Sequence, residues 1–137
     1  MGRFSVELQI SNHEDVVASR HRSLPREKIR RAVVKGVVDS SATRLVLPKA
    51  VVKQLGLPKG DAINVRFADG RRARKQTVTD AQVEIQGRSG TFSAVVEPGG
   101  TDALIGAIVL QELDLVVDCT TQKLVPRDPR GILAELD

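Results

Sequence analysis

Hydrophobic and polar residues alternate along several short stretches of the chain. Phe4, Val6, Leu8 and Ile10 occupy every second position, with polar residues between them. This is the pattern of a strand with one buried face. Comparable apolar runs predict further strands over residues 29–38, 63–67, 83–85, 92–96 and 103–105. Many short strands at close spacing favour a β-rich, barrel-like domain.

Turn and helix signals separate these strands. Pro48 and Gly56 bracket a short helix, because proline suits a first helical turn and glycine the position after the last. The segment AIVLQEL, at residues 107–113, has helical spacing and predicts a second short helix. Asp69-Gly70 predicts a hairpin turn whose outer part extends into solvent. Residues 11–27 are polar and contain a proline, so we expect a loop or an extension of the sheet edge there.

The composition narrows the class of protein. The 137 residues carry 21 Lys and Arg against 17 Asp and Glu, a formal net charge of +4. The only aromatic residues are three phenylalanines, so the core must be aliphatic, and aromatic platforms that stack nucleic-acid bases are nearly excluded. Cys119 is the only cysteine, which excludes an intrachain disulfide and a thiolate zinc cluster. We expect a cytoplasmic protein with no metal or organic cofactor and no membrane span.

The most informative segment is VVDSSATRLVLP, at residues 37–48. It places Asp39 at the end of an apolar strand, and the small residues that follow leave the carboxylate accessible. Such a placement suits a catalytic acid. It also suits an Asx turn, in which Asp39 accepts hydrogen bonds from the amides of Ser41 or Ala42. The residues alone leave both interpretations open.

Asp39-Ser40-Ser41-Ala42-Thr43 resembles the Asp-Thr/Ser-Gly-Ala-Thr signature of retropepsin-like (retroviral-type) aspartic proteases, in particular the small prokaryotic members. The likeness continues in LVLPKAVVKQLGL after the active-site loop, in FADGRR at the place of the family's flap hairpin, and in Leu104-Ile105-Gly106 as a second glycine turn. It covers roughly residues 3–126. We therefore expect a closed acid-protease-type barrel over residues 1–126, followed by a C-terminal tail over residues 127–137.

The resemblance implies peptide hydrolysis by two carboxylates that share one proton. The chain has one loop of this kind, because Asp118 in LVVDCTT lacks the apolar segment and glycine turn that follow Asp39. We interpret Asp118 as a strand-end turn residue. The second carboxylate then comes from another copy of the chain, which predicts a two-fold homodimer acting on a polypeptide. FSVELQI and KLVP are the expected interface strands.

Roles for further residues follow from the same resemblance. Asp39 is the catalytic residue, and the Ser40 hydroxyl braces the two loops across the two-fold axis. Ala42 and Thr43 shape the active-site loop. Asp69, Gly70 and Arg71 lie near the flap tip, which closes over an extended peptide and excludes water. Basic residues at this tip could attract acidic substrate segments, but a solvated hairpin is the favoured explanation of its charges.

One residue departs from the family pattern. Ser41 stands where the signature has glycine, and a non-glycine residue at a positive φ costs about 1 kcal/mol. The added hydroxyl can crowd the attacking water or donate a hydrogen bond that lowers the pKa of the carboxylate pair. The chain is then a weak protease, an inactive peptide-binding relative that keeps the dimer, or an inactivated variant, and the sequence leaves all three open.

A second family resembles part of the chain. The segment RLVLPKAVVKQLGLPKGDAINVRFADGR is similar to the swapped-hairpin DNA-binding modules of AbrB-like regulators. Basic residues cluster over residues 20–35 and 66–75, and a phosphate backbone attracts such clusters. That module uses residues 44–75 and leaves VVDSSAT and Leu104-Ile105-Gly106 without a role. Duplex DNA is therefore kept as an alternative partner, and the protease-like fold is favoured.

Overall fold

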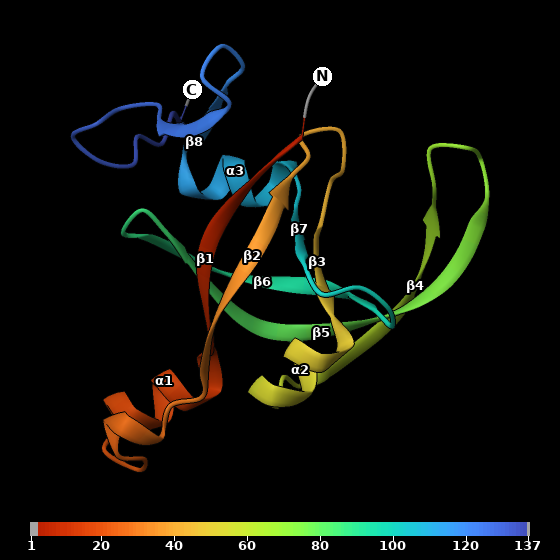
Figure 1. The fold of residues 1–137 in the computed structure, drawn as a ribbon. Coiled ribbons are helices and arrows are strands. Elements are labelled where there is room, and N and C mark those ends of the chain that lie inside the picture. Colours follow the sequence, from red (N-terminus) through yellow and green to blue (C-terminus); the bar gives the residue numbers. More distant parts are fainter. Residues whose placement is uncertain (1–2, 137) are drawn as a thin grey trace.

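The computed structural model of the protein describes residues 3–136; Met1, Gly2 and Asp137, which belong to the predicted domain and tail, lie outside the described residues. Short strands and helices alternate along the chain (Figure 1). The elements in chain order are β1 (Phe4–Asn12), α1 (His13–Arg20), a 3-10 helix (Arg26–Lys28), β2 (Arg31–Val38), β3 (Leu45–Pro48), α2 (Lys49–Leu55), β4 (Lys59–Arg66), β5 (Arg72–Ile85), β6 (Arg88–Glu97), β7 (Ala103–Ile105), α3 (Ala107–Leu113), β8 (Leu115–Asp118) and β9 (Lys123–Pro126).

Six strands form a closed barrel, as the sequence predicts. Their order is β1-β2-β7-β3-β6-β5, and pairing between β1 and β5 closes the ring. The β2–β7 and β3–β6 pairs are parallel, and the remaining pairs are antiparallel. Strand β4 pairs with β5 outside the ring, and β8 and β9 form a separate two-stranded sheet. Closure pairs the strand edges within one chain, which removes edges that would otherwise recruit other strands.

Aliphatic side chains fill the barrel, as expected for a chain with so few aromatic residues. Alternation along β1 buries Leu8 and Ile10 and leaves Ser5 and Glu7 exposed. Burial of such apolar surface is the main term that stabilises a fold of this size. The largest fully buried apolar side chains are Leu8, Ile10, Leu45, Leu47, Pro48, Leu55, Val83, Ile105, Val109 and Leu113.

The structure corrects the expected loop over residues 11–27. Helix α1 occupies His13–Arg20 of this segment, and Asn12 caps it by accepting a hydrogen bond from the amide of Asp15 at 3.1 Å. Acidic residues in its first turn, Glu14 and Asp15, favour the helix N-terminus electrostatically. The helix carries no clear apolar stripe, so its pattern does not predict it. Together with α2 and α3, the described residues therefore hold three α-helices instead of the expected one or two.

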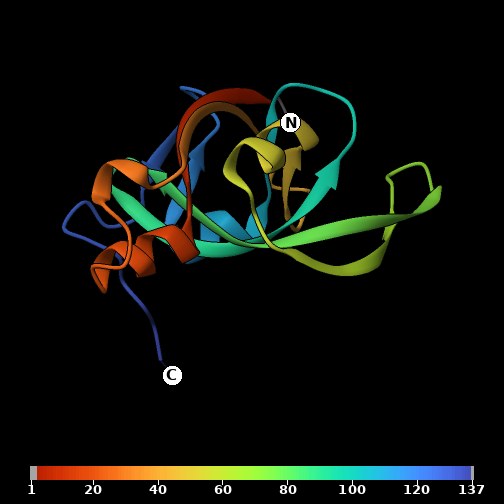
Figure 2. The same ribbon diagram turned by 90° about the horizontal axis from the view of Figure 1, so that it is seen from below.

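Different helices and strands lie at the two ends of the barrel. Helices α1 and α2 lie at one end, whereas α3, β8 and the last residues of β2 lie at the other, next to the N-terminal start of β1 (Figure 1). The hairpin of β4 and β5 extends sideways from the barrel, as the view from below also shows (Figure 2). No helix within residues 3–136 has the length and apolar character needed to cross a membrane.

The tail is held at the α3–β8 corner by one buried carboxylate. Asp114 accepts hydrogen bonds from Nε of Arg127 at 2.6 Å and from the amide of Leu133 at 3.0 Å. These contacts, the amide of Leu133 first and then Arg127, lower the pKa of Asp114. The predicted tail is thus attached to the domain at this corner.

Asn12 links the two helices at the far end and gives the first testable prediction. Its side chain is fully buried and donates to the carbonyl of Leu55 at 2.8 Å, in addition to capping α1. Asn12→Ala removes both contacts and leaves buried groups unpaired, so we expect the free energy of unfolding to fall by about 1–3 kcal/mol. Urea denaturation measures the loss, and Glu14→Ala, at an exposed position of the same helix, is the control. An Asn12→Ala protein as stable as the wild type contradicts this role.

Candidate active site

The end of β2 presents Asp39 to solvent at the end of the barrel that carries α3. Val38, the last residue of β2, is buried and pairs with Phe4 of β1, which anchors the backbone immediately before Asp39. The amide of Asp39 donates to the carbonyl of Ile105 at 3.0 Å, and the carbonyl of Asp39 accepts from the amide of Ala42 at 3.1 Å. The backbone on both sides of the carboxylate is therefore fixed by hydrogen bonds.

The predicted second glycine turn lies directly against the active-site loop. The amides of Ala107 and Ile108, at the start of α3, donate to the carbonyls of Ala42 and Thr43 at 2.8 and 3.0 Å. A Cβ on Gly106 would lie 2.6 Å from the carbonyl oxygen of Arg44, a distance that real side chains do not adopt. Glycine is required here because two backbone segments cross.

The Asp39 carboxylate has partners on both of its oxygens. The amide and the hydroxyl of Ser41 donate to Oδ1 at 3.1 and 2.5 Å, and Nη2 of Arg3 forms an ion pair with Oδ2 at 2.8 Å. The hydroxyl of Ser41 is the largest cause that lowers the pKa of Asp39, with its amide and the charge of Arg3 acting in the same direction against partial burial. At neutral pH the group is a carboxylate.

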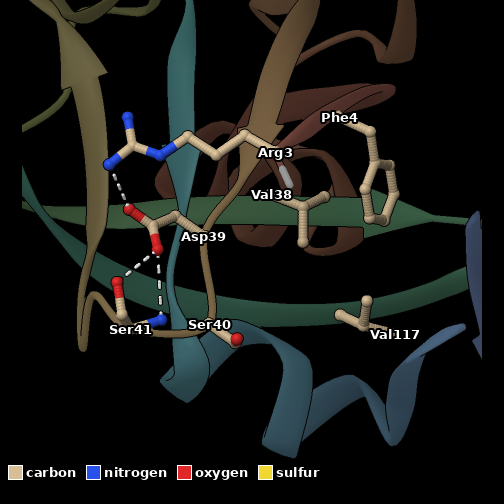
Figure 3. Close-up of a pocket in the computed structure, with 7 residues that line it drawn as sticks. All are labelled: Arg3, Phe4, Val38, Asp39, Ser40, Ser41 and Val117. Atoms are coloured by element: carbon tan, nitrogen blue, oxygen red, sulfur yellow. Dashed lines mark hydrogen bonds and ion pairs between the residues drawn. The ribbon is translucent and has the colours of Figure 1, made fainter. Parts of the chain in front are cut away.

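Figure 3 shows this carboxylate between Arg3 and the backbone of Ser41, while the hydroxyl of Ser40 points away from it. These residues, together with Phe4, Val38 and Val117, line a pocket of about 280 Å³. The Asp39 side chain is 12% exposed, against 64% for Arg3. The pocket thus joins one carboxylate, one exposed cation and apolar side chains from β1, β2 and β8.

A second hollow, which we call the β4 groove, lies between the active-site loop and β4. It has a volume of about 540 Å³ and is lined by Ser41, Ala42, Thr43, Arg44, Val46, Ile63, Asn64, Val65, Arg66, Phe67, Lys75, Val95, Glu97 and Leu104. Its apolar walls come from the alternating positions 63, 65 and 67 of the hairpin and from β3, β6 and β7. Volumes of this size suit the binding of a few side chains of a ligand.

The predicted flap residues form the tip of the hairpin. The amide of Phe67 donates to the carbonyl of Arg71 at 2.8 Å, and Gly70 has φ +88°, which explains the glycine. Asp69 accepts from the amide of Arg71 at 2.9 Å, and this contact is the main cause that lowers its pKa. Asp69, Gly70 and Arg71 line neither the Asp39 pocket nor the β4 groove, whereas their neighbour Phe67 lines the groove.

The structure brings most of the predicted site residues together. Asp39, Ser40 and Ser41 share the pocket, while Ser41, Ala42, Thr43 and Leu104 border the β4 groove. Ser41 differs from the expectation in one respect: it is not among the described residues with positive φ, so replacing glycine causes no left-handed backbone strain there. Its hydroxyl instead donates the hydrogen bond to Asp39 that the sequence analysis considered.

Sequence reasoning missed Arg3 altogether, and it named Lys75 and the segment that begins at Arg44 only for a possible DNA contact and not for this site. Arg3 lies beside Asp39 because β1 and β2 pair in register from Phe4 and Val38 onward, and no local motif signals that register. Arg44, in the loop just before β3, and Lys75, on β5, both line the β4 groove. Lys75 pairs with Ile63. Predicting the register of the β4–β5 hairpin would therefore have placed Lys75 at the groove.

Asp118 occupies a strand-end turn, as expected. Its Oδ1 accepts from the amides of Thr120 and Thr121 at 3.0 and 3.3 Å, and the Thr121 amide is the main cause that lowers its pKa. It lines neither of the two hollows around the active-site loop. Within residues 3–136 the pocket therefore contains one carboxylate, that of Asp39.

Comparison with known proteins agrees with this geometry. The family model described as gag-polyprotein putative aspartyl protease matches residues 28–112. The chain belongs to this family. The match contains β2, the active-site loop, the hairpin of β4 and β5, and the glycine turn before α3. A search of curated proteins returned no match.

The contact between Ser41 and Asp39 gives a prediction about titration in this aspartyl protease family member. Ser41→Ala removes a donor that favours the carboxylate, so we expect the pKa of Asp39 to rise towards its ordinary value. Carboxyl-carbon NMR measures the shift. Ser40→Ala is the matched control, because the Ser40 hydroxyl points away from the carboxylate (Figure 3).

The same shift has a consequence for stability. A carboxyl whose pKa is lowered by folding stabilises the protein above its unfolded pKa, and this contribution disappears as the pH falls through the folded pKa. Wild type should therefore exceed Ser41→Ala in free energy of unfolding at neutral pH, and the gap should close at acidic pH. A gap that widens as the pH falls would contradict this assignment.

Proposed function

We propose that the protein is an aspartic peptidase that acts as a homodimer, with Asp39 from each copy forming the catalytic pair. The observation that carries the proposal is the Asp39 carboxylate, whose backbone is held by two hydrogen bonds at one end of the barrel and which lines a solvent-accessible pocket, in a chain that matches the family model. Retropepsin-like proteins are typically dimers, and this pocket contains a single carboxylate.

Two carboxylates are needed because peptide hydrolysis requires a base and an acid together. One carboxylate takes a proton from water as the oxygen attacks the peptide carbonyl carbon, and the protonated partner gives its proton to the carbonyl oxygen. Collapse of the tetrahedral intermediate breaks the C–N bond, and the amine leaves with a proton from the pair. Two carboxyl groups about 3 Å apart share one proton because both cannot ionise at that distance.

The surface around the pocket supports the assembly of two copies. A hollow next to Ser40 is lined by residues of α3 and β8, including Leu110 and Leu115. Ile108 and Val116 are 44% and 40% exposed on these elements. Partly exposed apolar side chains near a site that needs a second copy favour a self-complementary interface. Burial of this face would bring the two Asp39 loops towards a common axis.

The strands named as interface candidates differ in their free edges. β1 (FSVELQI) is a barrel strand that pairs with β2 and, over Gln9–Asn12, with β5. β9 (KLVP) pairs with β8 along one edge only, within the part of the chain that the structure describes. Strand addition from a second copy is therefore easier at β9 than along the closed part of β1.

Two further functions use the same fold and make different predictions. An inactive peptide-binding dimer shows no turnover, and activity emerges in Ser41→Gly. A DNA-binding regulator binds duplex with an affinity that falls steeply with salt. Its exposed cations would include Arg71, Arg72 and Arg74 on the hairpin. The match of the family model across residues 28–112 favours the peptidase.

The central prediction concerns Asp39. Asp39→Asn should abolish cleavage of an unfolded protein at mildly acidic pH, because the amide can neither accept the proton of water nor share one with its partner. Specific activity of the wild type should also rise with protein concentration, in parallel with dimer formation measured by sedimentation. Asp118→Asn is the control and should keep activity. Cleavage that persists in Asp39→Asn excludes the proposed function.

The ion pair with Arg3 generates a second prediction. In the single chain, Arg3 forms an ion pair with one oxygen of Asp39. In the proposed catalytic pair, the carboxyl group from the second copy must lie at that position instead. Arg3→Gln should therefore raise the specific activity at low enzyme concentration and lower the dimer dissociation constant. Arg20→Gln, at an exposed position at the other end of the barrel, controls for net charge. Reduced activity in Arg3→Gln alone would place Arg3 in the working dimer instead.

A further inference from the structure

The β4 groove has an apolar floor beside the active-site loop. Val46 of β3, Val95 of β6 and Leu104 of β7 lie below it, and Ile63 and Val65 of β4 form its outer wall. Side chains of a strand alternate between its faces, so Ile63, Val65 and Phe67 share one face of the hairpin. The groove is thus shaped for aliphatic side chains of a ligand that passes next to Ser41.

Positive charge is concentrated at the edge of this apolar surface. Arg44 follows the active-site loop directly, and Lys75 lies on β5 opposite Ile63. The one carboxylate among the lining residues, Glu97, is 3.8 Å from Nζ of Lys75, which is a loose contact. The guanidinium of Arg44 has no ion-pair partner within residues 3–136.

The other charged side chains near the groove do not change its excess of positive charge. Arg66 also lines the groove, but it is opposite Arg72 in the hairpin, and strand alternation directs its side chain to the face away from Ile63 and Lys75. Arg71 is bound to Asp69 at 3.0 Å and covers the ring of Phe67 at 4.6 Å. Arg44 is therefore the cation that remains available to a ligand in the groove.

We infer that the groove selects peptide substrates that carry an aliphatic side chain and, two residues away, a carboxylate that Arg44 binds. Successive side chains of an extended peptide point in opposite directions. Two side chains that enter the same groove are therefore two residues apart. An arginine can hold a carboxylate through two parallel hydrogen bonds, so it distinguishes glutamate from its isosteric amide. Lys75 adds positive charge at the same edge. This inference names the substrate class and rests on the proposed peptidase function.

Matched fluorogenic peptides test the inference directly. Peptides with leucine at one position and Glu, Gln or Lys two residues away are compared by kcat/KM with the full-length protein. We expect Glu to exceed Gln by about fivefold, with Lys lowest, and the preference to shrink at high salt because the pair is partly exposed. Arg44→Glu should reverse the order to favour Lys. Arg72→Glu makes an equal charge change on the β4–β5 hairpin, outside the groove, and should leave the preference unchanged.

Binding measurements separate this inference from the proposed function. Fluorescence anisotropy with the same peptides and the Asp39→Asn protein reports recognition without turnover. A preference for Glu in binding that Arg44→Glu reverses, with no cleavage by the wild type, supports the inference and overturns the peptidase. Cleavage with equal kcat/KM for Glu and Gln, or a preference that survives Arg44→Glu, overturns the inference and leaves the peptidase standing. A chain that neither binds nor cleaves these peptides overturns both.

Discussion

The crossing of the glycine turn and the active-site loop is the constraint on which the site depends. Three backbone hydrogen bonds, of 2.8 to 3.0 Å, join Asp39, Ala42 and Thr43 to the segment from Ile105 to Ile108. A Cβ on Gly106 would lie within 2.8 Å of three backbone atoms of residues 43 and 44. Backbone atoms cannot rotate away as a side chain can, so a larger residue must displace the loop that holds Asp39. The position of the carboxylate therefore follows from close packing between segments more than sixty residues apart in sequence.

Under the proposed function, this fixed carboxylate explains how one chain can be folded and yet incomplete as a peptidase. In the single chain, Ser41 and Arg3 favour the ionised form of Asp39, and an ionised lone carboxylate can accept a proton but has none to donate. If a second carboxyl group takes the place of Arg3, the pair can hold a proton to donate, because two close carboxylates raise the proton affinity of the pair. Ser41 stays in contact through either state, since it belongs to the same loop. Replacing the family glycine with serine thus adds a donor beside the reacting groups without the backbone strain that the sequence suggested.

The barrel could be predicted from the sequence because its signals are local. Alternation marks β1, Pro48 and Gly56 mark the ends of α2, and Asp69-Gly70 marks the hairpin. The position of Asp39 between an apolar strand and small loop residues could be predicted in the same way, whereas its catalytic role stays a prediction. Helix α1 escaped prediction because its stability comes from contacts outside itself: Asn12 joins it to Leu55, and Asp15 is bound to Arg30 at 2.8 Å. Arg3 and Arg44 escaped for a related reason, since only strand register and barrel closure bring them to the site.

The segment that resembles AbrB-like modules shows how closure of the barrel limits the pairing of its strands with another chain. In this barrel β3 lies between β6 and β7, and β5 lies between β4 and β6 while its far end pairs with β1. These strands have no edge left for exchange with a second copy over their paired residues. The outer edge of β4 is the exception among the described strands of this segment, and it adjoins the β4 groove. A strand edge beside an apolar groove suits an extended peptide, whose backbone can pair while its side chains enter the groove. The hairpin thus fits peptide recognition through its backbone edge, whereas duplex DNA would contact only the exposed cations on its opposite face.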